Sequence, residues 1–223
     1  MSLSRSLSFS SSSTRRVFAE AATKWRAMLA AAPALRDVVS LQVASNFAFS
    51  GAQMTLLPLH LAASSFSPAE VATCFAAYSV GSLLAAQPVA KAADQLGKHR
   101  VLALGAALLS VSAVAVPHTQ SLSLSALLVA LAPMSVASAC LSSTPTAIVS
   151  DLSAQSERAQ AMSLLRTAGD LGLMSGAVVA GLVATHSSLG TAFYVDAAVV
   201  AAAITWFGGK YMRMKTLPSH HKD

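Results

Sequence analysis

Six long apolar segments, separated by short polar stretches, constrain this chain more than any other feature of its sequence. A helix that crosses the hydrocarbon core of a bilayer needs about 20 largely apolar residues. The six segments run approximately Val38–Ala63, Pro68–Ala90, Val101–Pro117, Leu122–Val149, Ala159–Ala184 and Gly190–Gly208. The sequence therefore predicts an all-α, polytopic membrane protein with six transmembrane helices, in a membrane domain that spans residues 36–210.

The composition agrees with a chain that lies in a lipid bilayer, and it argues against nucleic-acid binding. Charged residues make up 11% of the chain, whereas they make up about a quarter of a soluble domain. The net charge of +6 is compatible with nucleic-acid binding, but the basic residues form short clusters beside the apolar segments. They lack the interleaved aromatic residues of a base-stacking surface. We therefore expect no nucleic-acid partner.

No pattern in the sequence is typical of an enzyme or metal site. The chain has no Gly-rich phosphate-binding loop, no nucleophile elbow and no pair of His ligands on one helix. Cys74 and Cys140 both lie inside apolar segments and lack metal-ligand spacing. His60, His118 and His186 share no spacing either. We expect neither catalysis nor a metal site or cofactor.

The basic residues predict how the chain is oriented in the membrane. The loops between the first and second, third and fourth, and fifth and sixth apolar segments contain no Lys or Arg. Loops on the cytosolic side of a membrane carry an excess of Lys and Arg. Both termini are therefore predicted to be cytosolic, or to face the matrix or stroma of an organelle. The residues that predict this side are Arg15, Arg16, Lys24, Arg26, Arg36, Lys91, Lys98, Arg100, Arg158, Lys210, Arg213, Lys215 and Lys222.

The two ends of the chain differ from the apolar domain between them. Residues 1–35 are rich in Ser and Arg and contain no acidic residue before Glu20, which is typical of an organelle transit peptide. The alternative is a disordered cytosolic tail that leads into a basic helix around Lys24, Trp25 and Arg26. Residues 211–223 are predicted to form a basic cytosolic tail. An organelle membrane is thus one possible location.

The charged segment Ala90–Arg100 lies between the second and third apolar segments. Asp94 is placed at the end of one predicted helix, and Lys98 and Arg100 at the start of the next. Gly97 between them permits a tight reversal, because glycine adopts left-handed backbone conformations at little cost. Taken alone, the segment is equally compatible with a solvated turn whose charges fix the topology.

This spacing resembles the signature loop of the major facilitator superfamily, which lies between the second and third helices of each six-helix half. Asp94, Gly97, Lys98 and Arg100 match that loop, whereas Ala90, Gln95 and His99 depart from it as in the degenerate copy of C-terminal halves. Two further stretches are similar to family members, namely Ser67–Glu70 and Leu164–Gly172. The chain is most similar to a single six-helix half, helices seven to twelve.

The resemblance implies a secondary transporter, or half of one, that moves a small solute by alternating access. Asp94, Gly97, Lys98 and Arg100 would then form a cytosolic gate, with Asp94 docked on a helix of another half. That half would come from a second copy of the chain in a homodimer or from a second six-helix polypeptide. The alternatives are a regulatory half-transporter that does not itself transport, or a truncated fragment.

Polar residues in the first apolar segment recur on one face of the predicted helix. The residues are Gln42, Asn46, Ser50, Gln53 and His60, at steps of four, four, three and seven. A polar stripe facing lipid would be costly, so it must face protein or water. Because the first helix of each half lines the cavity in the similar family, Gln42, Asn46, Ser50 and Gln53 are predicted to bind substrate. The alternative is hydrogen bonding between helices.

Three ionisable residues lie within the later apolar segments, where charges are rare and often functional. Arg166 and Asp170 are one turn apart and can pair with each other, so they are predicted to act in structure or gating. Asp196 has no partner nearby in the sequence and is a candidate for proton coupling. Its position about six residues from the end of its segment favours hydration at the interface instead.

Overall fold

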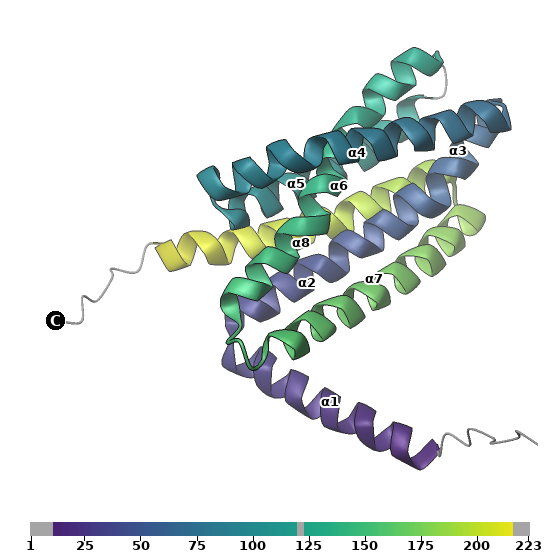
Figure 1. Cartoon of the computed structure of the whole chain (residues 1–223). Coiled ribbons are helices and arrows are strands. Elements are labelled where there is room, and N and C mark those ends of the chain that lie inside the picture. Colours follow the sequence, from purple (N-terminus) through teal and green to yellow (C-terminus); the bar gives the residue numbers. More distant parts are fainter. Residues whose placement is uncertain (1–10, 120–122, 216–223) are drawn as a thin grey trace, which may run out of the picture.

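The computed structural model describes residues 11–119 and 123–215, and every regular element in these ranges is helical (Figure 1). This confirms the predicted all-α fold class. The elements are α1 (Ser11–Ala31), α2 (Pro33–Ala48), the π-helix η1 (Phe49–Leu56), α3 (Leu57–Ala63), α4 (Pro68–Leu96), α5 (Lys98–Ala115), the 3-10 helix η2 (Val116–Thr119), α6 (Leu124–Leu152), α7 (Arg158–His186) and α8 (Leu189–Lys215).

The six predicted segments each correspond to one helical rod. The first is built from three consecutive elements, because α2, η1 and α3 follow one another without a break from Pro33 to Ala63. Within the described part of the chain, five helices are individually long and apolar enough to cross a membrane. A bent pair, Ala19–Ala31 with Pro33–Ala63, is the sixth candidate. The protein is thus an integral, multi-pass membrane protein.

Helix α1 occupies much of the segment that the sequence predicted to be a disordered tail. Its side chains Trp25, Met28 and Leu29 pack against the core of the bundle, which explains why a helix forms there. Pro33 then starts α2, and the axis turns by 115° between the two helices. Proline fits the first turn of a helix because its missing N–H is not needed there. The basic helix around Lys24 matches the alternative expectation, and residues 1–10 lie outside the described residues.

The rod formed by α2, η1 and α3 lies in the middle of the bundle, against α6, α7 and α8 (Figure 1). Helix α5 packs between α6 and α8, whereas α4 lies at the edge and packs mainly on α6. The outer face of α4 exposes Val80, Leu83 and Leu84. An apolar face of this kind suits contact with lipid tails, so the arrangement explains why α4 is apolar but poorly buried.

Helices α2 and α7 approach each other through two glycines. A Cβ atom added at Gly172 would lie 3.1 Å from the carbonyl carbon of Val43, and one added at Gly176 would lie 2.7 Å from that of Phe47. Small residues at helix interfaces let backbones approach closely in membrane proteins. Side chains larger than hydrogen are therefore excluded from this contact.

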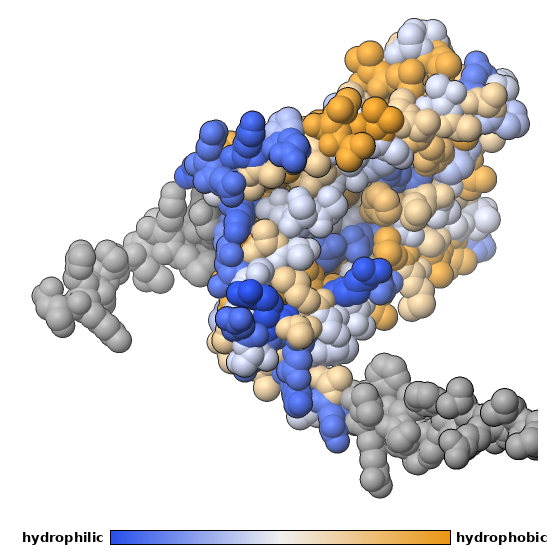
Figure 2. All heavy atoms as spheres, in the orientation of Figure 1, coloured by the Kyte–Doolittle hydropathy of each residue, from blue (hydrophilic) through white to orange (hydrophobic). Residues whose placement is uncertain are grey.

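The turn between α4 and α5 and the loop between α6 and α7 lie at the same end of the bundle, which we call the charged end. Lys98 Nζ, at the start of α5, lies 2.5 Å from Asp151 Oδ2, near the end of α6. Hydrophilic residues gather at this end in Figure 2, and residues of higher hydropathy cover more of the surface away from it. Of the basic residues that predicted the topology, Lys98 and Arg100 at the start of α5 and Arg158 at the start of α7 thus share this end, whereas Lys222 lies outside the described residues.

Candidate functional site

A groove between α6 and α7, with α2 as its floor, brings together most of the predicted substrate-binding residues. It contains two neighbouring pockets that share Gln42, Asn46 and Ser142. The first pocket, with a volume of about 160 Å³, continues between α2, η1, α5 and α6 as far as Gln53. The second, of about 420 Å³, extends along α7 and includes Arg166 and Asp170. The groove is open on one side of the bundle.

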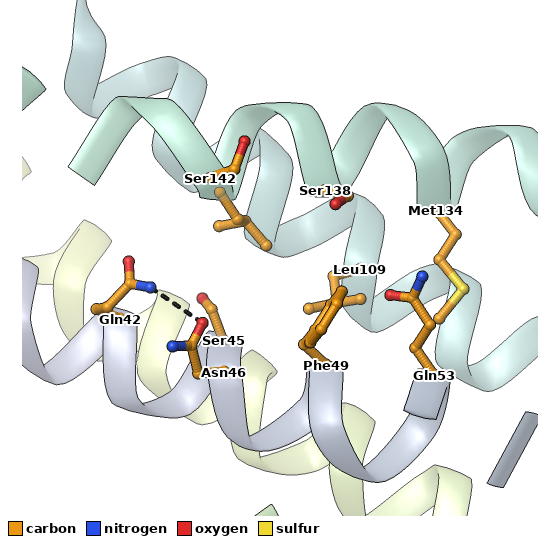
Figure 3. Close-up of a pocket in the computed structure, with 10 residues that line it drawn as sticks. Gln42, Ser45, Asn46, Phe49, Gln53, Leu109, Met134, Ser138 and Ser142 are labelled. Atoms are coloured by element: carbon orange, nitrogen blue, oxygen red, sulfur yellow. Dashed lines mark hydrogen bonds between the residues drawn. The ribbon is translucent and has the colours of Figure 1, made fainter. Parts of the chain in front are cut away.

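The first pocket holds polar atoms with unused hydrogen-bonding capacity (Figure 3). Gln42 Nε2 donates to Asn46 Oδ1 at 3.0 Å, which fixes the two amides relative to each other. The buried atoms Gln42 Oε1, Gln53 Oε1 and Ser45 Oγ have no hydrogen-bond partner among the described residues. Buried polar groups are normally hydrogen-bonded, so atoms of this kind in a pocket are suited to bind a polar ligand.

Ser50 does not line either pocket, although the helical phase of the sequence placed it there. The helix changes to a π-helix at Phe49, and this change shifts the residues that follow around the axis. Phe49 faces the pocket instead, and Ser50 is buried with its carbonyl accepting a hydrogen bond from Thr55 Oγ1 at 2.9 Å. Ser50 thus lies outside these two pockets because the chain is not a uniform α-helix here, and its role in substrate binding stays a prediction.

Helix α6 contributes polar residues that the sequence analysis missed. Ser138 and Ser142 line the first pocket and Thr146 lines the second, at steps of four along the helix. Hydroxyl residues at helical spacing inside the most apolar segment were the signal that could have identified them. The apolar part of the first pocket comes from Phe49, Leu109, Met134 and Leu141, which carry no distinguishing pattern in the sequence.

Arg166 and Asp170 both face the second pocket and are exposed. Their predicted pairing is not found, since no salt bridge joins these two described residues. The cation and the carboxylate are thus separately accessible at the side of the groove opposite α6. Together with the amides of Gln42 and Asn46, they give this pocket hydrogen-bond donors, acceptors and both signs of charge.

Asp196 is fully buried between α8 and η1, with an exposed fraction of 0%. Neither carboxylate oxygen has a hydrogen-bond partner among the described residues. The interpretation that Asp196 is hydrated at the interface is therefore wrong. Its distance from the helix end is short, but η1 covers it from the side, and that contact cannot be seen in the sequence of α8.

Four of the predicted gating residues, Asp94, Gly97, Lys98 and Arg100, lie at the charged end, in and beside the turn between α4 and α5. Helix α4 ends at Leu96, and Gly97 follows with φ +94° before α5 begins at Lys98. Asp94 and Arg100 are exposed, and Asp94 has no hydrogen bond or salt bridge to any residue of the described ranges. The partner of Lys98 is Asp151, which the sequence analysis did not identify.

The three histidines considered as metal ligands, His60, His118 and His186, lie in separate environments. His60 is buried, and its ring meets that of Phe193 edge to face with centroids 5.8 Å apart. Its Nε2 lies 3.3 Å from Thr119 Oγ1. His118 Nε2 lies 3.2 Å from the hydroxyl of Tyr194, and His186 is exposed in the last turn of α7. The described residues contain no group of three or more His, Cys, Asp and Glu side chains placed to hold a metal ion.

Similarity to a known protein family covers most of the helical domain. No curated protein matches the chain. The sequence model of the Major Facilitator Superfamily matches residues 39–222, which include most of α2 and every later helix. The chain therefore belongs to the Major Facilitator Superfamily, a family of membrane transporters that move small solutes across a lipid bilayer.

Proposed function

We propose that this chain forms one side of a pathway for a small polar solute, which binds in the groove between α6 and α7. The observation that carries the proposal is the pair of amides, Gln42 and Gln53, whose buried oxygens face a pocket without partners. Asn46 lies between them and completes a polar surface on the floor of the groove. Such atoms can replace the hydration shell of a polar solute as it leaves water.

The side chains of the second pocket favour a solute that carries charges of both signs. Arg166 and Asp170 lie one turn apart, with no salt bridge between them, and a zwitterion would satisfy both. Charge-assisted hydrogen bonds of this kind are roughly twice as strong as neutral ones. A zwitterion bound to both charges would lie in the second pocket, beside the amides of Gln42 and Asn46 that the two pockets share.

The mechanism that fits this arrangement is alternating access, with a second six-helix bundle closing the open side of the groove. That bundle would be a second copy of this chain in a homodimer or another polypeptide. The charged end would face the cytosol, or the matrix or stroma, and Asp94, Gly97, Lys98 and Arg100 would act there as the gate. The carboxylate of Asp94 is exposed and has no partner among the described residues, so it is available to dock on the second bundle.

Uptake into proteoliposomes tests the binding part of this proposal. The purified chain would be reconstituted and supplied with a panel of radiolabelled amino acids. Asn46→Ala combined with Gln53→Ala should raise the apparent KM for a transported amino acid, because both changes remove polar groups from the groove. Ser50→Ala is the matched control, since Ser50 is buried on the same helix but lies outside both pockets. If the double variant lowered only thermal stability, the amides would act in packing.

The gating part is tested separately with Asp94→Asn. This change should reduce uptake while leaving the melting temperature in detergent unchanged, because Asp94 is exposed and forms no bond within the described bundle. Unchanged uptake would contradict the gate.

A regulatory half-transporter is the second candidate, because the groove opens to one side of the bundle. Native mass spectrometry of the full chain distinguishes the two. A strictly monomeric particle would contradict autonomous alternating access, whereas a dimer would support it.

A further inference from the structure

Asp196 is a buried acidic group that the proposed solute site does not use. It lies on α8 at the contact with η1, fully shielded from solvent, and neither of its oxygens is hydrogen-bonded within the described chain. Beside it, Ser110 Oγ on α5 donates to the carbonyl oxygen of Ala197 at 2.9 Å, which holds α8 against α5. The carboxyl group therefore lies inside a packed contact between helices, away from solvent.

The space for this carboxyl group exists because residue 51 is glycine. A Cβ atom added at Gly51 would lie 2.7 Å from both Asp196 Cγ and Asp196 Oδ1, closer than van der Waals contact allows. Gly51 belongs to the π-helical turn η1 (Phe49–Leu56). Such turns are rare and occur frequently at functional sites. The space left by Gly51 and the buried carboxyl group of Asp196 are two independent features, and they lie in direct contact.

None of the charged or titratable side chains on the elements packed against α8 is hydrogen-bonded to Asp196 within the described chain. Helix η1 contains none, and those of α5 are in its first turn, at the charged end. His60 on α3 contacts Phe193, about one turn before Asp196, and lies within 3.3 Å of Thr119. The remaining groups are Arg36 and Asp37 on α2, His118 on η2, and Arg158, Arg166, Asp170 and His186 on α7. No described group forms a hydrogen bond with either oxygen of Asp196.

An ionised carboxylate in this position would be an unpaired charge in an apolar interior, which is very unfavourable. A metal cation would not resolve this, because hard cations need several oxygen ligands, and among the described residues Asp196 is the one carboxylate at the contact between η1 and α8. A proton needs a single oxygen. The arrangement around Asp196 thus suits a neutral carboxyl group.

We propose that Asp196 is a proton-binding site whose occupancy is transmitted through η1 to the solute pocket. In the state described here the carboxyl group carries a proton and rests against Gly51. Loss of the proton to water breaks one O–H bond and leaves a carboxylate that must gain water or a partner. Helices α8 and η1 must then separate.

Asp196 is connected to the first pocket through only a few residues of η1. Gln53 follows Gly51 by two residues on the same π-helical turn, and its side chain lines the first pocket (Figure 3). A movement of η1 away from Asp196 therefore displaces Gln53 directly. This inference rests on the proposed function only in taking that pocket as the solute site.

Two measurements test the inference without any solute. Infrared spectroscopy of the full chain in liposomes should show a carboxylic-acid C=O band at neutral pH that is lost in Asp196→Asn. The band should be unchanged in Asp170→Asn, the exposed control on α7. Absence of the band in the wild-type chain would overturn the proton site, and because this measurement needs no variant to fold, the inference can be rejected even if Asp196→Asn is unstable.

The coupling is tested by thiol labelling of Gln53→Cys in a Cys74→Ala/Cys140→Ala background. The reference is Ser142→Cys in the same background, since Ser142 lines the same pocket from α6. The ratio of the two labelling rates should rise several-fold as the pH is raised, because η1 moves away from Asp196 when the carboxyl group loses its proton. Dividing by the rate at Ser142→Cys removes most of the general rise of thiol reactivity with pH. Adding Asp196→Asn should make the ratio independent of pH. A pH dependence that persists in Asp196→Asn would overturn the coupling, whereas failure of amino-acid uptake alone would contradict only the proposed solute.

Discussion

The turn at the charged end and the contact between η1 and α8 place acidic residues in opposite environments. In the turn, Asp94 is exposed, and the salt bridge between Lys98 and Asp151 is formed by side chains that are 30% and 59% exposed. At the helix contact, Asp196 is fully buried and forms no hydrogen bond with any residue that the structure describes. Exposed ion pairs contribute about 0–1 kcal/mol, whereas a buried polar group without a hydrogen-bond partner costs about 1–3 kcal/mol even when it is neutral. Replacing the charged residues of the turn should therefore change the stability little, whereas the buried carboxyl group of Asp196 lowers it.

The largest expected effect is at the interior contact. Gly51→Ala should destabilise the protein by about 1–3 kcal/mol, because the new methyl group overlaps the carboxyl group of Asp196. Thermal unfolding in detergent measures this loss. Gly51→Ala combined with Asp196→Ala should recover most of it, since the methyl group then fills the space that the carboxyl group left. If the two changes were simply additive, the contact between Gly51 and Asp196 would be wrong.

A smaller effect is expected in the turn, from Gly97→Ala. The backbone of Gly97 has φ +94°, and a left-handed conformation costs a non-glycine residue about 1–2 kcal/mol. The loss comes from the backbone alone, because no atom lies within 4 Å of an added Cβ. Gly181→Ala is the control, as that site on α7 is equally open but helical, and alanine should be neutral or stabilising there. Equal melting temperatures for the two variants would contradict the strain at Gly97.

The smallest effect is expected from the salt bridge between Lys98 and Asp151. Replacing either residue with Ala should change the free energy of unfolding by less than about 1 kcal/mol, because solvent screens the pair. A double-mutant cycle with thermal unfolding gives the coupling energy directly. Raising the salt concentration should reduce that energy further. If the coupling energy between Lys98 and Asp151 were as large as the stability lost in Gly51→Ala, the charged turn and the interior contact would not differ in their contribution to stability.

The helical rods could be predicted closely because hydropathy is a local property of the sequence. The segment predicted as Ala159–Ala184 is helix α7, Arg158–His186, and the one predicted as Val101–Pro117 is α5 with η2. Helix α1 was expected only as one of two alternatives and only around Lys24, since its stability comes from the packing of Trp25 and Met28 on the rest of the bundle. Tertiary packing of this kind leaves only a weak signal in a Ser- and Arg-rich segment.

The candidate site was predicted only in part. Gln42, Asn46 and Gln53 line the groove as the polar stripe indicated, but Ser50 does not, because the π-helix changes the phase after Ala48. A period of 3.6 residues cannot reveal such a change. The burial of Asp196 depends on which helix packs on α8, and the sequence around Asp196 does not contain that information.

The contact of Gly172 and Gly176 with the backbone of α2 has a mechanical consequence. No side chain separates α7 from the carbonyl groups of Val43 and Phe47, so one helix cannot slide past the other without a collision between main chains. Helices α2 and α7 are therefore held in a fixed register along the Gly172 and Gly176 contact. The opposite wall of the groove is less constrained, because Pro133 and Pro145 each remove a backbone hydrogen bond from α6.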